Sequence, residues 1–334
     1  VLRKPTYVYW GRCTGCGLCA ERCPVRVPDE FNAGLGERGA IYIMFPQAVP
    51  RKAVIDRENC LYFRTGACRL CERVCPAGAI DYGQEPEVVE LEVASIVVAT
   101  GFRLRDPRSA REYGYGRFEN VFTNLEFERL LSSTGPTGGR ILRRSDGRPP
   151  RRIAWVQCVC SRDRENPHCS YYCCAASVKH AIMARQRLPE ADCCVFYIDL
   201  RAHGKGFQEF FDRAEREFGV RFVRGRPGKV EEDPETKNLL VYYEDVLSGE
   251  FRVEEFDMVV LAVGVEPNGV PWLPAGPHGF LSSDPTDPVA TAVEGVYAAG
   301  MAAGPKDIHD SVIEAGAAAA RAAAWARGVV GCPG

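Results

Sequence analysis

The sequence predicts an α/β fold with a separate cysteine-rich α+β domain at its N-terminus. Two observations predict this class. Eight of the 16 cysteines fall in two blocks before residue 76, too clustered for scattered core thiols. Beyond them, three apolar runs end in glycine, as parallel strands do where their carboxyl ends meet a cofactor. These runs are Ile96–Gly101, Phe256–Gly264 and Gly295–Gly300. The formal net charge of −2 argues against a nucleic-acid-binding protein, which carries a basic excess.

The first cysteine block has the C-x2-C-x2-C-x3-C-P spacing of a bacterial-type ferredoxin. It consists of Cys13, Cys16, Cys19 and Cys23, followed by Pro24. Three thiolates on a tight loop bind one iron–sulfur cube. The fourth thiolate lies further along the following helix, and the proline after it ends that helix. The fourth thiolate can therefore bind a second cube.

The second block repeats the C-x2-C-x3-C-P ending, although its first gap is seven residues long. It consists of Cys60, Cys68, Cys71 and Cys75, followed by Pro76. The repeat predicts two [4Fe–4S] clusters with crossed ligation. One is assigned to Cys13, Cys16, Cys19 and Cys75, and the other to Cys60, Cys68, Cys71 and Cys23. A zinc site is the alternative, and the two Cys-Pro endings argue against it.

A glycine motif, Gly34-x-Gly36-x-x-Gly39, lies between the two blocks. A dinucleotide fingerprint follows a strand and opens a helix, whereas this motif follows the proline-containing segment 27–29. We therefore interpret it as a turn-rich connector within a ferredoxin-like 2[4Fe–4S] domain at residues 1–88.

After residue 88 the pattern becomes that of an α/β protein in two portions. Residues 89–150 and 255–330 form one portion, and residues 151–254 form the other. The first portion is predicted to end in the alanine-rich helix 315–327, preceded by a capping box at Ser311-x-x-Glu314.

The portion 151–254 alternates strands and helices. Strands are predicted at 152–157, 194–199 and 220–223, helices at 175–188 and 207–218, and a hairpin around Ser248-Gly249. In a pyridine-nucleotide domain the first strand leads into G-x-G-x-x-G, but here it leads into Cys158-Val-Cys160. The sequence therefore predicts that a nicotinamide site is absent here.

A third cysteine group occupies that place, with the spacing C-x10-C-x3-C-C. It consists of Cys158, Cys169, Cys173 and Cys174. Adjacent cysteines rarely form a mutual disulfide, whereas two thiolates at a helix start can both bind metal. The spacing alone leaves a cluster and buried or redox-active thiols as alternatives. Cys160, Cys193 and Cys194 are interpreted as packed thiols.

The chain resembles the A subunits of heterodisulfide reductases, an iron–sulfur flavoprotein family. The resemblance extends from residue 13 to about residue 325. It rests on the stretches CTGCGLCAERCPV, EFNAGLGERGAIYIMFPQAVP, CRLCERVCPAGAIDYGQEP, IVVATGF, YGYGRFENVFTNLEFERLLSSTGPTGGRI and GPKDIHDSV. It implies a thioredoxin-reductase-like core of two Rossmann-like dinucleotide domains, with residues 151–254 as the NAD-domain-like unit. It also implies a third [4Fe–4S] cluster on Cys158, Cys169, Cys173 and Cys174.

The resemblance further implies FAD. Full-length members have an N-terminal part with the FAD-binding glycine motif and further ferredoxin motifs at the C-terminus, and this sequence lacks both parts. We expect a fragment, a split subunit or an incomplete sequence. The remaining candidates on the FAD side are Thr100, Gly101, Gly300, Lys306 and Asp307. Lys306 is expected either near the flavin ring or in solvent.

The function implied by the resemblance is electron transfer between ferredoxin-type clusters, FAD and a partner subunit, with flavin-based electron bifurcation. The implied partners are ferredoxin, a disulfide-reducing subunit, a small iron–sulfur subunit, and an adaptor to a hydrogenase or formate dehydrogenase. No catalytic side chain is assigned. The alternatives are a flavin-free iron–sulfur scaffold and an NAD(P)H-dependent flavoprotein with attached ferredoxin.

The N-terminus has no apolar signal core, and no run of 18 apolar residues predicts a membrane span. Clustered cysteines without a secretion signal favour a reducing compartment, so a cytoplasmic location is expected.

Overall fold

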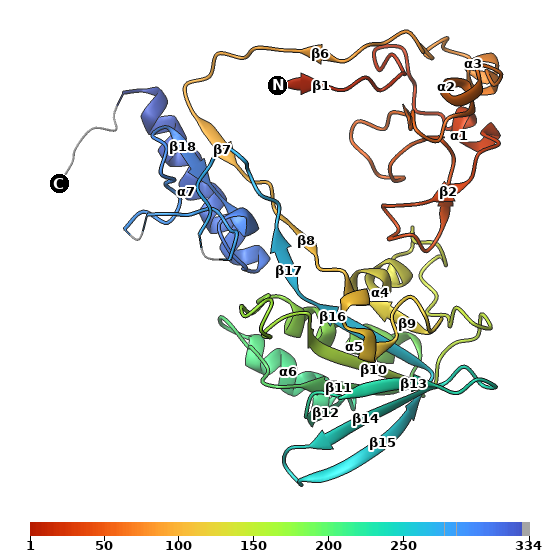
Figure 1. Cartoon of the computed structure of the whole chain (residues 1–334), viewed down its shortest axis with the longest axis vertical. Helices are drawn as coiled ribbons and strands as arrows, with labels where there is room; N and C mark the ends of the chain where they lie inside the picture. The colour runs from red at the N-terminus through yellow and green to blue at the C-terminus, as the bar shows by residue number, and fades with distance from the viewer. Residues whose placement is uncertain (277, 285, 329–334) are drawn as a thin grey trace. The chain divides into compact units, whose positions relative to one another are not determined.

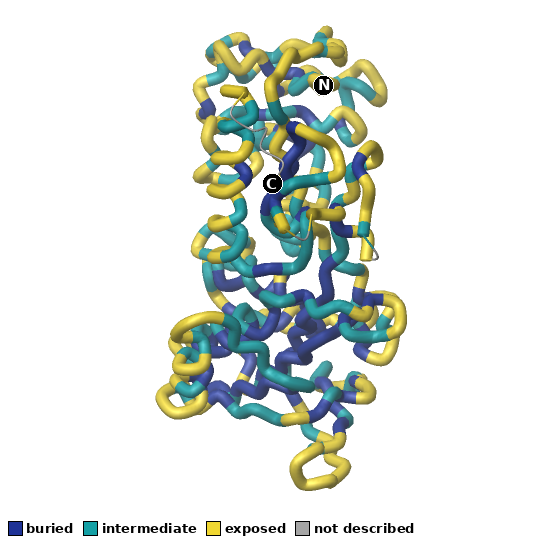
Figure 2. Tube along the Cα trace, turned by 90° about the vertical axis from the view of Figure 1, so that its left-hand side faces the viewer, coloured by how far each residue is buried: buried dark blue, intermediate teal, exposed yellow. Residues whose placement is uncertain are grey.

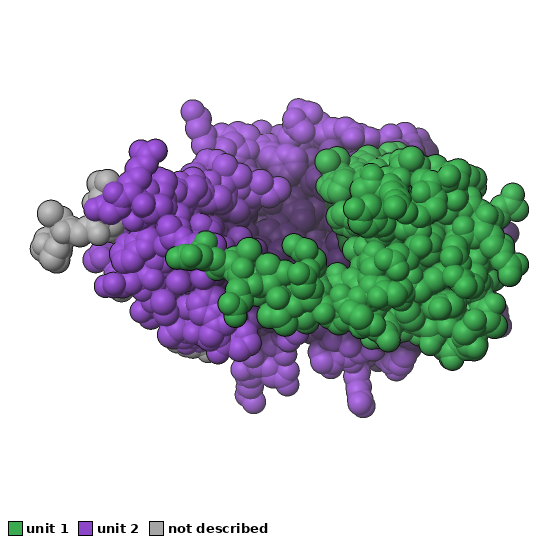
Figure 3. Space-filling model, turned by 90° about the horizontal axis from the view of Figure 1, so that it is seen from above, with its two compact units in different colours: residues 1–92, 128–140 green, residues 93–127, 141–334 purple. Residues whose placement is uncertain are grey.

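The computed structural model describes residues 1–276, 278–284 and 286–328. The chain divides into two compact units, coloured differently in Figure 3. One comprises Val1–Glu92 with Glu128–Arg140, and the other comprises Val93–Phe127 with Ile141–Gly334. The sequence-predicted limits at residues 88, 150 and 254 stay a prediction.

The first unit consists of short elements, as its many glycines and prolines predict. Its strands pair in antiparallel couples, β1 with β6, β2 with β3 and β4 with β5. The elements are β1 (Leu2–Arg3), α1 (Leu18–Arg22), β2 (Val27–Pro28), β3 (Glu37–Arg38), β4 (Ile41–Tyr42), β5 (Val54–Ile55), α2 (Leu61–Thr65), α3 (Leu70–Val74) and β6 (Glu87–Val88). Its small core includes the thiols of Cys23, Cys60 and Cys71 among apolar side chains.

The second unit is built on a parallel sheet of five strands in the order β12-β11-β10-β16-β9 (Figure 1). Its strands are β9 (Val121–Thr123), β10 (Arg152–Val159), β11 (Asp192–Tyr197), β12 (Arg221–Arg224) and β16 (Met258–Val263). All six residues of β16 are buried, and so are the last seven of β10 (Figure 2). Burial on both faces explains why these strands read as continuous apolar runs.

Different elements cover the two faces of this sheet. On one face, an antiparallel sheet contributes Val230, Leu239 and Tyr243 to a core shared with Phe196. Its strands are β13 (Lys229–Glu232), β14 (Leu239–Asp245) and β15 (Glu250–Phe256). Helix α5 (Cys173–Arg187) packs against β10, β11 and β16 and contacts α6 (Phe207–Arg216).

The remaining elements precede, interrupt or follow the strands of this sheet in the chain. Strand β7 (Ile96–Val98) pairs parallel with β18 (Val296–Ala298), and β8 (Phe102–Leu104) pairs antiparallel with β17 (Val265–Pro267). The helices are η1 (Pro107–Ser109), η2 (Arg111–Tyr113), α4 (Asn124–Leu131), η3 (Gly300–Ala302) and α7 (Ile308–Ala326). The predicted α/β class is thus confirmed.

Two sequence-based details are wrong. Helix α7 begins at Ile308 with Asp307 as its N-cap, so Ser311 and Glu314 lie inside the helix instead of forming a capping box. The Asp307 carboxylate accepts a hydrogen bond from the Asp310 amide at 2.8 Å, which supplies the cap one turn earlier than predicted. The sequence also favours a half-buried strand from Glu90 that leads into the run Ile96–Gly101, but the strand starts only at Ile96, because residues 90–95 find no strand partner.

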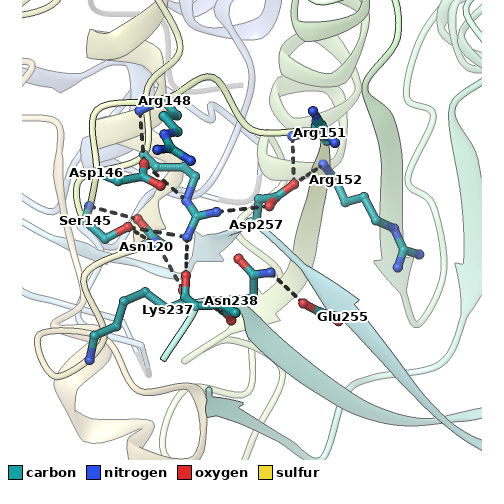
Figure 4. Close-up of polar contacts among 12 residues, drawn as sticks. Asn120, Ser145, Asp146, Arg148, Arg151, Arg152, Lys237, Asn238, Glu255 and Asp257 are labelled. Carbon is teal, nitrogen blue, oxygen red and sulfur yellow. Dashed lines mark hydrogen bonds and ion pairs between the residues drawn. The ribbon is translucent and has the colours of Figure 1, made fainter. Parts of the chain in front are cut away.

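A buried ion pair connects Asp257, the residue before β16, to Arg143 in the segment before β10 (Figure 4). One Asp257 oxygen lies 3.1 Å from Arg143 Nη1. The other accepts hydrogen bonds of 2.7 Å from the backbone amides of Arg151 and Arg152. Only 9% of the Arg143 side chain and 16% of the Asp257 side chain are exposed, so water replaces little of this interaction if it is broken.

We predict that Asp257→Asn lowers the free energy of unfolding by about 3 kcal/mol, because it leaves Arg143 without its buried counter-charge. At roughly 2 to 4 °C per kcal/mol, the unfolding temperature falls by roughly 6 to 12 °C. Anaerobic thermal unfolding followed by circular dichroism measures this. Asp146→Asn is the control, because Asp146 is one-third exposed and 3.6 Å from Arg143 Nε. Equal effects of the two changes would contradict the prediction.

Candidate metal centres and cofactor groove

Four thiols from both cysteine blocks surround one cavity of the first unit. They belong to Cys13, Cys16, Cys19 and Cys75, and the other walls are mostly apolar. The Ala79 amide donates a hydrogen bond of 3.4 Å to the Cys75 sulfur. Four sulfur donors around one apolar cavity match the ligand set of a [4Fe–4S] cluster.

Glycines shape the loop that carries the first three of these thiols. Gly15 and Gly17 have φ of 72° and 88°, in the left-handed region. A Cβ at Gly15 would lie 2.2 Å from the carbonyl oxygen of Arg51, so no side chain fits there. The Arg51 guanidinium donates to the Gly15 carbonyl at 2.6 Å, and the Lys52 ammonium donates to the Cys13 carbonyl. The loop is therefore held in a tight curve before α1 begins.

Four other thiols surround a second cavity. They belong to Cys23, Cys60, Cys68 and Cys71. The Cys71 sulfur lies 3.1 Å from the Tyr82 hydroxyl. A Cβ at Gly39 would lie 2.9 Å from Cys23 Cβ, so the last glycine of the Gly34–Gly39 motif has a packing role beside this cavity. This donor set also fits a [4Fe–4S] cluster.

At the ends of the short helices α1 and α3, one thiol of each block lies in the wall of the cavity formed by the other block. Cys23 and Cys75 are the C-caps of α1 and α3, and both have extended backbone with ψ of 126° and 108°. The prolines that follow cannot continue a helix. Burial raises the pKa of the Cys19 thiol to about 11 and also raises that of Cys71. Without metal, both thiols are therefore protonated at neutral pH.

A β-bulge positions the first thiol of the third cysteine group. The register between β10 and β16 shifts between Val156 and Val159, which gives β10 one extra residue. Cys158 lies in this bulge with φ of 60°. Bulges often turn a side chain toward a functional site. The sequence gives no sign of this bulge, because Gln157 and Cys158 directly follow the apolar residues 153–156 of an ordinary strand.

The other thiols of this group lie at the start of α5. Cys173 and Cys174 are both 2% exposed, and Cys169 is half-buried. Burial raises the pKa of Cys158 to about 11, with the nearby Cys174 and Cys169 adding to the effect. A hydrogen bond from Cys173 lowers the pKa of Cys174. The Cys173 thiol thus lies within electrostatic reach of the other three predicted thiols.

Cationic and strained residues accompany this group. The Arg162 guanidinium interacts with Cys158 and forms an ion pair with Asp199. Cys158, Cys160, Arg162 and Tyr171 all have positive φ between 53° and 69°. Such conformations are rare outside glycine and are often found at functional sites. Sequence reasoning had no signal for either Arg162 or Tyr171.

A mostly apolar groove of the second unit contains three of the five predicted FAD-side residues. Gly101, Lys306 and Asp307 line it, together with Phe102, Tyr171, Tyr172, Ala175, Ala176, Lys179, Arg201, His203, Phe207, Phe210, Met301, Ile308, His309, Ser311, Val312 and Ala315. Within the described residues, Arg201 Nε and His203 Nε2 are buried without a hydrogen-bond partner. Aromatic walls with unsatisfied polar atoms fit a planar ligand that carries both donors and acceptors, as a flavin does.

Lys306 is buried and paired. Only 9% of the residue is exposed, which excludes the solvated lysine that the sequence left open. Its Nζ lies 2.8 Å from a Glu314 oxygen and donates to the Gly300 carbonyl at 2.9 Å. The same Glu314 oxygen accepts from the Gly300 amide at 2.9 Å. Thr100 is outside the groove lining, and its hydroxyl donates to the Asn268 carbonyl at 3.1 Å.

The remaining cysteines lie elsewhere. Cys193 and Cys194 are fully buried in β11, and the Cys160 sulfur lies 3.4 Å from the Ser109 hydroxyl. Cys332 lies outside the described residues. His168 Nε2 lies 3.1 Å from the Val265 carbonyl oxygen, and no described contact joins it to the third cysteine group.

A family model described as a 4Fe–4S dicluster domain matches residues 12–79. This range contains both cysteine blocks and therefore all eight thiols that line the two cavities. The prediction of a ferredoxin-type iron–sulfur domain at the N-terminus is confirmed.

Curated relatives match nearly the whole chain. It is 49% identical over 332 residues to the second iron–sulfur A subunit of the CoB–CoM heterodisulfide reductase of Methanopyrus kandleri, covering 96% of this chain and 50% of that protein. The chain belongs to the heterodisulfide reductase A-subunit family. Another member is the A subunit of the H2:CoB–CoM heterodisulfide,ferredoxin reductase of Methanothermobacter marburgensis, 45% identical with the same coverage. A third is the A subunit of the H2/formate:CoB–CoM heterodisulfide,ferredoxin reductase of Methanococcus maripaludis, 45% identical over 98% of this chain and 51% of that protein. The chain spans about half the length of these relatives.

Among solved structures, this family member is similar to the Lactococcus lactis thioredoxin reductase in its FR conformation. The identity is 17%, each chain is covered to 86%, and the TM-score is 0.48. Among the residues that the structure describes, no helix combines the length and apolarity needed to cross a membrane.

Proposed function

We propose that this chain is an electron-transfer part of a heterodisulfide reductase-like oxidoreductase, active within a complex. The observation that carries the proposal is the pair of cavities, each lined by four thiols, in a chain of this family. When bound, [4Fe–4S] clusters supply one-electron carriage. The chain's own contribution is to hold them through Cys13, Cys16, Cys19 and Cys75, and through Cys60, Cys68, Cys71 and Cys23.

A third [4Fe–4S] cluster on Cys158, Cys169, Cys173 and Cys174 is part of this proposal. Its support is a group of four neighbouring thiols, three of them buried, beside the Arg162 cation. Burying a cluster with four thiolates requires nearby positive charge or hydrogen-bond donors. Arg162 offers the charge, and the strained backbone around Cys158 directs the thiol.

FAD is the proposed ligand of the groove lined by Gly101, Lys306 and Asp307, with Thr100 and Gly300 beside it. A flavin, when bound, exchanges electrons singly or in pairs. Lys306 is buried and paired with Glu314, and Asp307 caps α7, so both residues are held in place and can orient the ligand. Electron splitting by flavin-based bifurcation is the proposed mode of action.

The proposed partners follow the names of the relatives, which include ferredoxin, H2 and formate. We propose a disulfide-reducing subunit, a small iron–sulfur subunit, an adaptor to a hydrogenase or formate dehydrogenase, and ferredoxin. The cytoplasmic location expected from the sequence stays a prediction.

The test is cofactor content after anaerobic purification, by native mass spectrometry with iron and flavin determination. Three clusters correspond to about 12 iron atoms per chain, and one FAD is expected. Cys173→Ser combined with Cys174→Ser should lower iron to about 8. The adjacent pair Cys193 and Cys194, changed in the same way, is the matched control and should retain about 12. About 8 iron atoms in the unaltered chain, or no flavin, would contradict the corresponding part of the proposal.

A further inference from the structure

Two polar side chains beside the third cysteine group are buried without partners. Gln157 is 1% exposed and Ser177 is 0% exposed. Among the described residues, neither the Gln157 amide nitrogen nor its oxygen has a hydrogen-bond partner, and neither does Ser177 Oγ. Buried polar groups in native proteins are almost always hydrogen-bonded. Both side chains therefore require a hydrogen-bond partner that is not among the described protein groups.

The bulge in β10 determines which way Gln157 faces. Val156 and Val159 both belong to the core between the sheet and the β13–β15 layer. Residues three apart in a regular strand lie on opposite faces, so the extra residue is accommodated between these two valines. Gln157 and Cys158 consequently both lie on the other face of the sheet. Trp155 lies on that face too, where its ring contacts Phe127 of α4.

Helix α5 covers this second face. It follows β10 in the chain and leads to the parallel strand β11, so its beginning lies over the carboxyl end of β10. Cys173 and Cys174 form its first turn, and Ser177 follows them by one turn on a buried side of the helix. Gln157 and Ser177 thus enter the same sheet–helix interface as the thiols of Cys158 and Cys174, which interact with each other.

We propose that Gln157 and Ser177 donate hydrogen bonds to sulfur atoms of the [4Fe–4S] cluster held by Cys158, Cys169, Cys173 and Cys174, and so raise its reduction potential. The inference rests on the proposed third cluster. One-electron reduction adds negative charge to the cluster, and N–H and O–H donors to sulfur stabilise this charge. The Arg162 cation acts in the same direction. The two residues position and tune the cluster without being ligands.

The experiment measures the reduction potential of this cluster in the full chain. Anaerobic redox titration followed by EPR gives the potential, and the signal is assigned by its loss in Cys174→Ser. Gln157→Leu and Ser177→Ala should each shift the potential to more negative values, with a larger shift in the double variant and iron content unchanged. Ser177→Ala removes a single oxygen and is expected to fold. The reduction potential can therefore still be measured in this variant if Gln157→Leu impairs folding.

Cys160→Ser is the matched control, because this residue follows Cys158 in the chain but belongs to the core on the opposite face. In the Cys160→Ser variant, the reduction potential of the third cluster should equal that in the unaltered chain. If Gln157→Leu and Ser177→Ala both keep the full iron content and the reduction potential of the third cluster is unchanged in both, this inference is overturned and the proposed third cluster still stands. About 8 iron atoms in the unaltered chain overturns the proposed third cluster, and this inference with it.

Discussion

Replacing Cys23 by alanine is expected to abolish the cluster of the second cavity, although Cys23 belongs to the first cysteine block. The physical reason is that Cys23 leaves α1 in an extended conformation and joins Cys60, Cys68 and Cys71 around that cavity. Cys75 leaves α3 in the same way and joins the thiols of the first block. A cube that loses one of four thiolates loses a corner ligand and is expected to be lost on isolation.

The decisive version of this test uses a background without the first cluster, made by Cys13→Ala with Cys16→Ala. Adding Cys75→Ala should leave the remaining iron unchanged, because Cys75 then has no cluster to bind. Adding Cys23→Ala should remove about four more iron atoms per chain. Iron and sulfide determination with EPR distinguishes the two variants. The reverse pattern would mean that each block holds its own cluster.

Gly264→Ala is expected to lower the free energy of unfolding by about 3 kcal/mol and to impair the third cysteine group. A Cβ at this position would lie 2.2 Å from the Cys160 carbonyl oxygen and 2.9 Å from its carbonyl carbon. Backbone cannot rotate away as a side-chain tip can. The Gly264 amide also donates to the Val159 carbonyl at 2.7 Å, so displacement breaks a contact that holds the end of the bulge.

Anaerobic thermal unfolding and iron content per chain measure this effect. Gly269→Ala is the matched control, since nothing lies within 4 Å of the Cβ it would add. The control should change the free energy of unfolding by about 0.5 kcal/mol or less. If Gly264→Ala keeps both the unfolding temperature and full iron content, the segment from Val159 to Ser161 is more adaptable than its packing indicates.

Much of the fold and of the first two sites followed from local patterns. The spacing of eight cysteines, with a proline after each block, predicted two four-thiol sets that the structure gathers around two cavities. Such a prediction is possible because all eight ligands lie on short loops and helices near one another in the chain. Apolar runs also predicted β10, β16 and β18, because strands buried on both faces consist mostly of apolar residues.

The third site depends on contacts between distant segments. The amino-acid sequence around Gln157 and Cys158 does not indicate a bulge. The bulge exists because β10 must pair with β16, about 100 residues later in the chain. The other two differences are local. Lys306 looked equally compatible with solvent, and its partners Glu314 and the Gly300 carbonyl are only eight and six residues away. The capping error at α7 arose because a capping box pattern also fits residues already inside a helix.

By itself, the sequence determined the ligand chemistry of this chain and the strands that carry its core. Both are properties of residue type and short spacing, which the backbone geometry of loops, helices and strands converts directly into structure. The direction in which Cys158 faces, and the buried polar groups that lie unpaired beside it, were decided by the tertiary structure. These depend on the pairing and packing of segments far apart in the chain, and no local pattern encodes the free energy of such contacts.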